Sequence, residues 1–336
     1  MGNTSANRNS KNPRILNVAL IQMCPKPYEL RENLRLALKL AKDSLKKGAN
    51  LIVFHELFDS GYCVALHDKD FALDFAKPKN HATFKALSAF AKENAVHIVA
   101  CGIEKSGKKL YDTAYIIAPS GKCVGKHRKI YLWGDEKSRF SRGKKYEVFK
   151  LNFGNFSAKV GLQICYEIGF GVGANILALQ GAEILIYPSA FGAARAYNWD
   201  LLSRARAVEN GCFVLACNHS GAEVANSSRS DFSRFHESRS LQRTASASHS
   251  LDSQKRKNSS AILEFASKNK DAESIEFAGD SRIISPKGTI IKKATKLNEA
   301  IIARIDLDEI FAQREAIPYL KDFDTKLTKR SFGKST

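Results

Sequence analysis

The chain has 336 residues, of which 44% are hydrophobic and 10% aromatic, so it can bury a sizeable core and is not disordered throughout. It contains 53 Lys and Arg against 34 Asp and Glu, a net charge of +19. No apolar run reaches the roughly 18 residues of a membrane-spanning helix, and the polar first residues lack the apolar segment of a signal peptide. We therefore expect a cytoplasmic protein that does not associate with membranes.

The positive charge raises the question of nucleic-acid binding. The basic residues are spread along the whole chain, and no zinc-finger spacing, basic zipper or RNA-stacking motif accompanies them. We therefore expect no nucleic-acid partner. The seven cysteines are an odd number and stand mostly in apolar runs without metal-ligand spacing. This pattern predicts reduced, buried thiols in a cytosolic protein and no metal site.

Hydrophobic periodicity predicts that strands and helices alternate through most of the chain. In chain order, the expected elements are a strand at 15–21, a helix at 28–47, a strand at 51–54, a helix at 84–94, strands at 96–103, 110–117 and 160–165, a helix at 175–180, a strand at 184–187, a helix at 199–209, a strand at 213–217, a hairpin at 282–292 and a strand at 300–305. Many of the strands are apolar throughout. This predicts an α/β layered fold in which helices cover the sheet.

The composition divides the chain into one domain, two tails and an insertion. We expect a flexible tail at 1–13, a domain at 14–321 and a C-terminal tail at 322–336. Between 222 and 273 the composition shifts to Ser, Arg, Asn and Lys, which is typical of a disordered surface insertion. We interpret it as a tolerated loop, because a long loop adds little closure entropy. The alternative is a regulatory or RNA-contacting segment.

Three charged residues are candidates for catalysis. Glu56 follows the apolar strand at 51–54, and active sites of layered α/β folds gather at strand ends; its alternative role is to cap a turn. Lys129 stands in a basic run but is followed at once by apolar residues, so it would need a carboxylate partner if buried. Glu136 lies seven residues further on, in a loop that could equally be a solvated charged surface.

A cysteine provides the fourth candidate. Cys165 closes an apolar strand and precedes a stretch that contains glycine. A tight turn from strand to helix presents a nucleophile on a strained elbow. It also exposes the next backbone N–H, that of Tyr166, as a donor to an oxyanion. The alternative is that Cys165 is an inert core residue.

Together, these four sites resemble the nitrilase, or carbon–nitrogen hydrolase, superfamily, which uses Glu, Lys and Cys in this chain order. Further segments resemble the same family at 19–23, 110–121, 179–191, 199–210 and 281–288. The resemblance covers residues 14–221 and 275–321. It implies a four-layer αββα sandwich that pairs into αββα–αββα dimers, and we expect a homodimer or a higher homo-oligomer.

The resemblance also implies a role for each candidate. Cys165 is the nucleophile, Glu56 the general base and acid, Lys129 the oxyanion stabiliser, and Glu136 a second glutamate that positions Lys129 and the substrate. Three further residues are expected to contact the substrate: Tyr62, Tyr166 through its backbone N–H, and Phe191. Neither a metal nor an organic cofactor is needed.

Departures from the family pattern bear on the substrate. Many members place an arginine and then Phe-Pro-Glu after the cysteine, but residues 167–172 lack that run. Tyr166 stands where true nitrilases commonly have Trp, which favours amides over nitriles. The run 132–137 resembles members that act on short aliphatic or ω-substituted amides. The expected reaction is hydrolysis of such an amide through a cysteine thioester, with release of ammonia. The alternatives are an N-carbamoyl amine hydrolase and a catalytically silent binding protein of the same fold.

Overall fold

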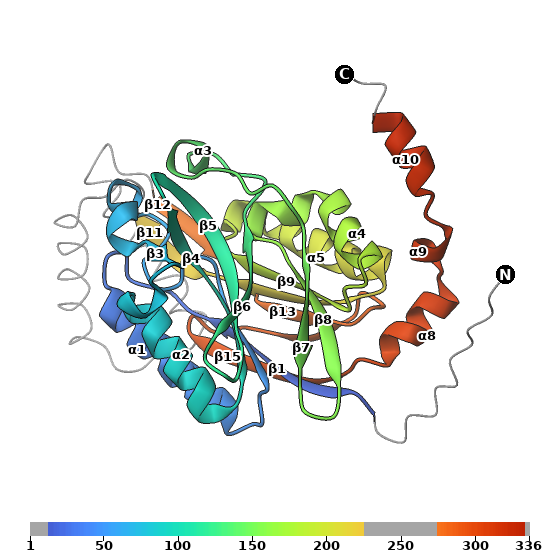
Figure 1. The fold of residues 1–336 in the computed structure, drawn as a ribbon, viewed down its shortest axis with the longest axis horizontal. Coiled ribbons are helices and arrows are strands. Elements are labelled where there is room, and N and C mark those ends of the chain that lie inside the picture. The colour runs from blue at the N-terminus through green and yellow to red at the C-terminus, as the bar shows by residue number, and fades with distance from the viewer. Residues whose placement is uncertain (1–12, 225–273, 333–336) are drawn as a thin grey trace.

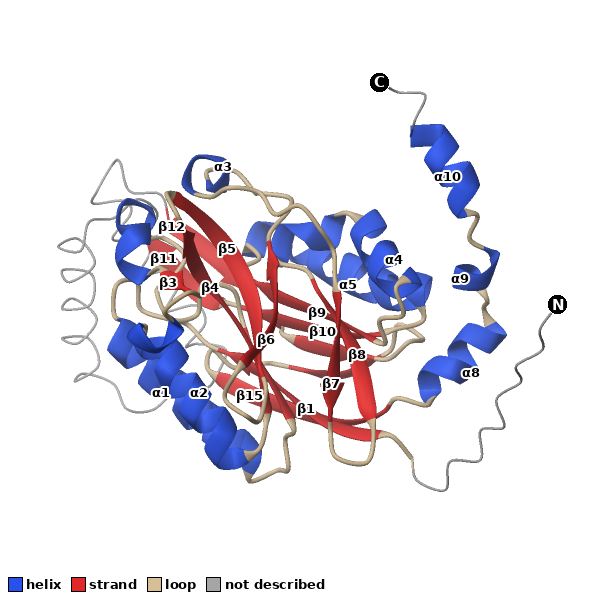
Figure 2. Cartoon of the chain, viewed as in Figure 1, coloured by secondary structure: helices blue, strands red, loops and turns tan. Residues whose placement is uncertain are grey.

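Two β-sheets lie face to face in the computed structural model, which describes residues 13–224 and 274–332 (Figures 1 and 2). The first sheet has the strand order β15-β1-β2-β4-β5-β6, with β3 beside β4. Its strands are β1 (Ile15–Gln22), β2 (Leu51–Phe54), β3 (Leu73–Asp74), β4 (His97–Ser106), β5 (Lys109–Ile117), β6 (Cys123–Arg128) and β15 (Glu299–Asp306). Strands β1, β2, β4 and β3 run parallel, whereas β15 is antiparallel to β1, β5 to β4 and β6 to β5.

The second sheet has the order β14-β13-β10-β9-β8-β7. Its strands are β7 (Val148–Asn152), β8 (Ser157–Leu162), β9 (Ile184–Ser189), β10 (Phe213–Asn218), β13 (Arg282–Ile284) and β14 (Ile290–Lys293). Strands β8, β9 and β10 are parallel, so their carboxyl ends lie at one edge. A separate antiparallel pair consists of β11 (Ser220–Val224) and β12 (Ser274–Ala278).

Helices cover the outer face of each sheet (Figure 2). Helices α1 (Leu30–Leu45) and α2 (Ala82–Asn94) pack on the first sheet, and α4 (Gly171–Leu179) and α5 (Ala196–Asn210) pack on the second. The remaining helices are α3 (Glu136–Arg139), α8 (Glu309–Ala316), α9 (Tyr319–Asp322) and α10 (Thr325–Phe332). Short 3-10 turns occur at Ala65–Phe71, Pro78–Asn80, Cys165–Gly169 and Ala193–Arg195. The expected four-layer αββα sandwich is confirmed; its pairing into dimers stays a prediction.

Strand β1 shows why an unbroken apolar run marks a central strand of this fold. Side chains alternate between the faces of a strand. Leu16, Val18 and Leu20 therefore join the core between the two sheets, whereas Ala19 and Ile21 join the core beneath α1 and α2. All five are fully buried. Burial on both faces favours an apolar residue at every position, which is the pattern that the sequence displays.

Several sequence predictions need correction. Strand β8 ends at Leu162 rather than at 165, and Glu136 begins a short helix instead of lying in a loop. Residues 222–224, assigned to the insertion, belong to β11, where Glu223 is buried. The predicted C-terminal tail contains α10. The rest of the predicted insertion, 225–273, and most of the predicted N-terminal tail lie outside the described residues.

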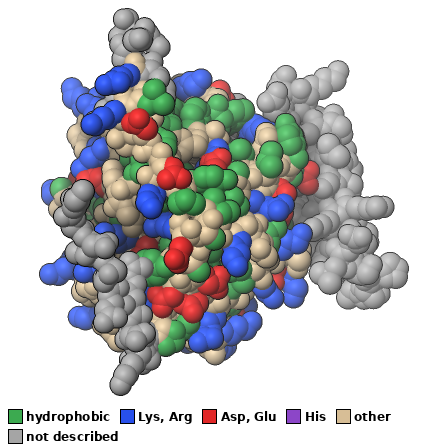
Figure 3. Space-filling view, turned by 90° about the vertical axis from the view of Figure 1, so that its right-hand side faces the viewer, with side chains coloured by type: hydrophobic (Ala, Val, Ile, Leu, Met, Phe, Trp, Pro, Cys, Tyr) green, Lys and Arg blue, Asp and Glu red, His purple; other side chains and the backbone are tan. Residues whose placement is uncertain are grey.

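The positive charge is not concentrated on the face that Figure 3 shows. There, Lys and Arg side chains are interspersed with acidic and hydrophobic ones. Among the described helices, none is long and apolar enough to cross a membrane.

Candidate active site

Cys165 lies on a strained turn, three residues after the end of β8. It begins the 3-10 turn Cys165–Gly169, and its φ of +47° is in the left-handed region that side-chain-bearing residues rarely adopt. The carboxylate of Glu167 closes this turn by accepting the Ile164 N–H at 2.7 Å. The same carboxylate accepts the Ile130 N–H at 3.0 Å. Glu167 therefore ties the cysteine elbow to the segment that carries Lys129, a role that sequence reasoning did not assign.

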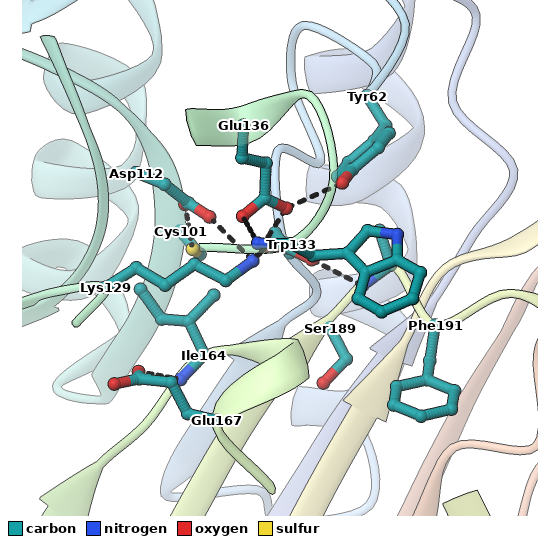
Figure 4. Close-up of polar contacts among 12 residues, drawn as sticks. Tyr62, Cys101, Asp112, Lys129, Trp133, Glu136, Ile164, Glu167, Ser189 and Phe191 are labelled. Carbon is teal, nitrogen blue, oxygen red and sulfur yellow. Dashed lines mark hydrogen bonds and ion pairs between the residues drawn. The ribbon is translucent and has the colours of Figure 1, made fainter. Parts of the chain in front are cut away.

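Lys129 is fully buried, and its ammonium is surrounded by carboxylates (Figure 4). Its Nζ lies 2.5 Å from Glu56 Oε1, 2.8 Å from Glu136 Oε1 and 3.4 Å from Asp112 Oδ2. We expected a carboxylate partner for a buried Lys129, and the structure shows three. Asp112 was not among the predicted site residues. Asp112 is on β5, which pairs with β6, and Lys129 directly follows β6. The sequence alone does not reveal this strand pairing.

Two of the three carboxylates, those of Glu56 and Glu136, have further contacts that fix their direction. Glu56 Oε2 accepts the backbone N–H of Ala190 at 2.7 Å. Glu136 Oε2 accepts the Trp133 N–H at 2.9 Å, and its Oε1 accepts the Tyr62 hydroxyl at 2.6 Å. These bonds leave the carboxylates little freedom to rotate, so the site is held before any substrate arrives.

Burial and neighbouring charge shift the proton affinities of the cluster. Burial, with a smaller contribution from Asp112, raises the pKa of Glu56 to about 8 although Lys129 opposes the shift. Burial alone would lower the pKa of Lys129, but the carboxylates of Glu136 and Glu56 outweigh it and raise that pKa well above its usual value. Burial also raises the pKa of the Cys165 thiol. The resting site therefore holds a charged ammonium and a neutral thiol.

A small cavity of about 50 Å³ opens beside the cysteine. Residues that line it are Tyr62, Trp133, Cys165, Tyr166, Ala190, Phe191, Gly192, Arg195, Ile275 and Phe277. The three predicted substrate-contacting residues, Tyr62, Tyr166 and Phe191, are all among them. The sequence analysis did not predict Ile275 and Phe277, because β12 borders the region predicted as an insertion. It also did not predict Trp133, Ala190, Gly192 and Arg195 as cavity residues.

The buried carboxylate of Glu223 holds the loop that carries Tyr62. Glu223 of β11 accepts the backbone N–H groups of Tyr62 and Cys63, at 2.9 and 2.8 Å. His219 lies 2.6 Å from the same carboxylate and stacks on Phe277. The short β11–β12 pair therefore supports one wall of the cavity and orients the tyrosine that bonds Glu136.

The general family model for carbon-nitrogen hydrolases matches residues 17–315. The chain belongs to the carbon–nitrogen hydrolase family. Omega-amidase NIT2 of Xenopus tropicalis is 28% identical over 312 residues, which cover 90% of this chain and 92% of that protein. A hydrolase of Schizosaccharomyces pombe is 34% identical over 220 residues, covering 62% of this chain and 65% of the relative.

Solved structures agree with this assignment. Saccharomyces cerevisiae Nit3, a member of the nitrilase superfamily, superimposes with a TM-score of 0.69 at 26% identity, over 90% of this chain and 94% of that one. A carbon-nitrogen hydrolase from Helicobacter pylori gives a TM-score of 0.74 at 23% identity, over 95% and 98%, which supports the fold. The resemblance seen in the sequence is therefore confirmed, and the protein is an enzyme of the class that hydrolyses carbon–nitrogen bonds.

Proposed function

We propose that this enzyme hydrolyses a small aliphatic or ω-substituted amide, releasing ammonia through a thioester on Cys165. The observation that supports this most is that Cys165 lines a small cavity while a buried Glu56–Lys129 pair, 2.5 Å apart, exerts its charge on the thiol. Such a set can take a proton, attack a carbonyl and stabilise the resulting oxyanion. Relatives named omega-amidase point to the same chemistry.

The first half-reaction transfers the acyl group to sulfur. Because the Cys165 thiol is neutral at rest, the Glu56 carboxylate removes its proton as sulfur attacks the amide carbon. The Lys129 ammonium and the Tyr166 backbone N–H stabilise the negative charge on the carbonyl oxygen. Protonated Glu56 then gives its proton to the leaving nitrogen, which departs as ammonia. Its pKa of about 8 suits a group that must both accept and donate a proton near neutral pH.

The second half-reaction releases the acid. Glu56 removes a proton from water, which attacks the thioester carbon, and the sulfur leaves and regains a proton. Glu136 holds Lys129 throughout, through the 2.8 Å contact with its ammonium. Tyr62, Tyr166 and Phe191 contact the substrate in this scheme, since they line the cavity with Cys165.

Ammonia release from matched amides, N-carbamoyl amines and nitriles tests the proposal. We expect the wild type to hydrolyse short amides and Cys165→Ala to lose all turnover. Cys123→Ala, which removes a half-buried thiol on β6 outside the cavity, should keep it. Turnover of carbamoyl amines alone would favour that alternative. No turnover of any amide by the wild type, or equal turnover by Cys165→Ala, would overturn the proposal.

We further propose that the enzyme forms homodimers through α4 and α5. Large apolar side chains are exposed on these two helices, namely Val172, Ile176, Leu179, Tyr197 and Leu201. Apolar clusters of this kind mark association surfaces. Light scattering should give twice the chain mass, and Leu201→Glu should halve the measured mass.

We also propose a cytoplasmic location, because all seven cysteines are free thiols.

A further inference from the structure

His219 is a fully buried histidine to which the proposed reaction gives no role. It lies between β10 and β11, where the second sheet ends and the β11–β12 pair begins. Its backbone is fixed on both sides, because its N–H donates to the Ser189 carbonyl oxygen at 2.8 Å and its own carbonyl oxygen accepts the Gly279 N–H at 3.0 Å. The imidazole of His219 is therefore attached to a rigid part of the fold.

The two ring nitrogens of His219 differ in their contacts. Nε2 lies 2.6 Å from Glu223 Oε1. Because the Glu223 carboxylate also accepts two backbone N–H groups, it acts as an acceptor, and the Nε2–H of His219 donates to it. Nδ1 is buried and has no hydrogen-bond partner within the described ranges 13–224 and 274–332. A phenyl ring would avoid the cost of that unpaired nitrogen, so the bond to Glu223 is the reason for a histidine here.

This bond is the first of two routes from His219 to Tyr62. Glu223 Oε2 accepts the backbone N–H groups of Tyr62 and Cys63, at 2.9 and 2.8 Å. The Nε2–H of His219 is bonded to the other oxygen of the same carboxylate. A carboxylate bonded through both oxygens resists rotation, so His219 keeps it directed at the loop. This route is polar, and it acts on the backbone of Tyr62.

The second route is aromatic. The ring of His219 stacks on that of Phe277, with centroids 3.8 Å apart and an interplanar angle of 28°. The ring of Phe277 in turn meets the ring of Tyr62 edge to face, with centroids 5.9 Å apart and an interplanar angle of 73°. Phe277 and Tyr62 both line the cavity beside Cys165. This route therefore acts on the ring of Tyr62 and on the cavity wall.

Tyr62 connects both routes to the charged cluster. Its hydroxyl donates to Glu136 Oε1 at 2.6 Å, as Figure 4 shows. The same oxygen lies 2.8 Å from Lys129 Nζ. A displacement of the Tyr62 loop or ring would therefore move a hydrogen bond that orients Glu136.

His219 also packs against the segment that carries Glu56. The rings of His55 and His219 lie with their centroids 5.0 Å apart. His55 directly precedes Glu56, and its Nδ1 donates to the Glu56 backbone carbonyl oxygen at 2.9 Å. His219 thus contacts both the support of the cavity wall and the residue next to the proposed base.

We infer that His219 is a positioning residue that holds Tyr62 by two routes, one polar and one aromatic. The hydroxyl of Tyr62 is thereby kept on Glu136. This inference rests on the proposed amidase function, in which Glu136 acts by holding Lys129. His219 is not among the residues that line the cavity, so it acts through its neighbours and not on the substrate.

Two substitutions separate the routes. His219→Phe keeps a ring that can stack and removes the donor to Glu223, whereas His219→Gln keeps an N–H donor and removes the ring. Both are measured on the amide that gives the fastest ammonia release. We expect His219→Phe to lower kcat about tenfold with little change in KM, because a misplaced Tyr62 no longer orients Glu136. We expect His219→Gln to raise KM about 2- to 10-fold with a smaller effect on kcat, because Phe277 loses its supporting ring.

His97→Gln is the matched control. His97 is also a buried histidine packed against a phenylalanine, with its ring centroid 4.7 Å from that of Phe153, but it lies on β4 and does not line the cavity. This variant should keep the wild-type kcat and KM. A His219 that merely stabilised the fold would behave differently: both of its variants would have lower melting temperatures and the same loss of kcat, with KM unchanged. That result would overturn the inference.

Hydrogen exchange separates failure of this inference from failure of the proposed function. The N–H groups of Tyr62 and Cys63 donate to Glu223, so their exchange rates report the polar route without any substrate. Mass spectrometry of the peptide that contains them should show exchange roughly tenfold faster in His219→Phe and near the wild-type rate in His219→Gln. If no amide is hydrolysed, the amidase proposal fails and the exchange rates alone decide about His219. Equal rates in His219→Phe and the wild type would overturn the inference.

Discussion

Replacing Asp112 by asparagine removes one of the three carboxylates around Lys129 while keeping the side chain's size. Oxygen atoms of Glu56, Asp112 and Glu136 lie within 4.8 Å of one another. Two unit charges at that separation interact by roughly 3 kcal/mol at an effective dielectric constant of about 20, equivalent to about two pKa units. Because Lys129 partly neutralises Asp112, we expect the pKa of Glu56 to fall from about 8 by roughly one to two units.

The pH dependence of kcat/KM measures this shift. Glu56 must be ionised to accept the thiol proton, so activity rises with pH through its pKa. The acid limb should therefore lie near pH 8 in the wild type and move to lower pH in Asp112→Asn. Asp59→Asn is the matched control, since Asp59 is a buried carboxylate that accepts the Thr83 hydroxyl outside the site. An acid limb that stays in place in a folded Asp112→Asn enzyme, or moves to higher pH, would refute the reasoning.

Three further substitutions test the supports of the site. Lys129→Met leaves buried carboxylates without their cation and should cost about 3–5 kcal/mol of unfolding free energy, measured by urea denaturation; an unchanged midpoint would contradict the charge cluster. Glu223→Gln weakens the acceptor that holds the Tyr62 loop and should lower kcat roughly tenfold through misplacement; in a double-mutant cycle with Tyr62→Phe the two losses should not add. Gly143→Ala would place a Cβ 2.0 Å from the carbonyl oxygen of Arg128 and should cost about 1–3 kcal/mol or more, whereas Gly169→Ala, where a Cβ meets no atom within 4 Å, should leave the melting temperature nearly unchanged.

The pattern of apolar residues was sufficient to predict the central strands, because both of their faces are buried and nearly every position is apolar. Strand β6 was missed for the opposite reason: its buried residue is a histidine. His127 is buried because its Nε2 lies 2.8 Å from a carboxylate oxygen of Glu167, 40 residues further along the chain. Strand β11 was missed likewise, since Glu223 is buried by contacts with the loop at Tyr62 and Cys63. A polar strand whose partners are distant in sequence shows no periodicity that a single sequence can reveal.

The four candidates identified by family motif do converge, but the residues that position them carried no such signal. Glu56, Lys129 and Glu136 meet in one buried cluster next to Cys165. Asp112 belongs to an ordinary-looking strand segment, and only the pairing of β5 with β6 brings it to Lys129. Predicting that Asp112 belongs to the site would have required the register between β5 and β6, which the sequence pattern does not determine.

In the proposed mechanism, residues from both sheets act on the substrate, so catalysis would require that the two sheets stay packed together. Glu56 follows β2 and Lys129 follows β6, so the proposed base and the cation come from the first sheet, whereas the proposed nucleophile Cys165 follows β8 of the second. The Ala190 N–H, directly after β9, crosses between the sheets to bond Glu56 at 2.7 Å. A buried ammonium is tolerable because it is paired with carboxylates, and hydrogen bonds fix those of Glu56 and Glu136. The apolar packing between the sheets excludes water and so raises the pKa of Glu56, which in the proposed mechanism suits it to act as both acid and base.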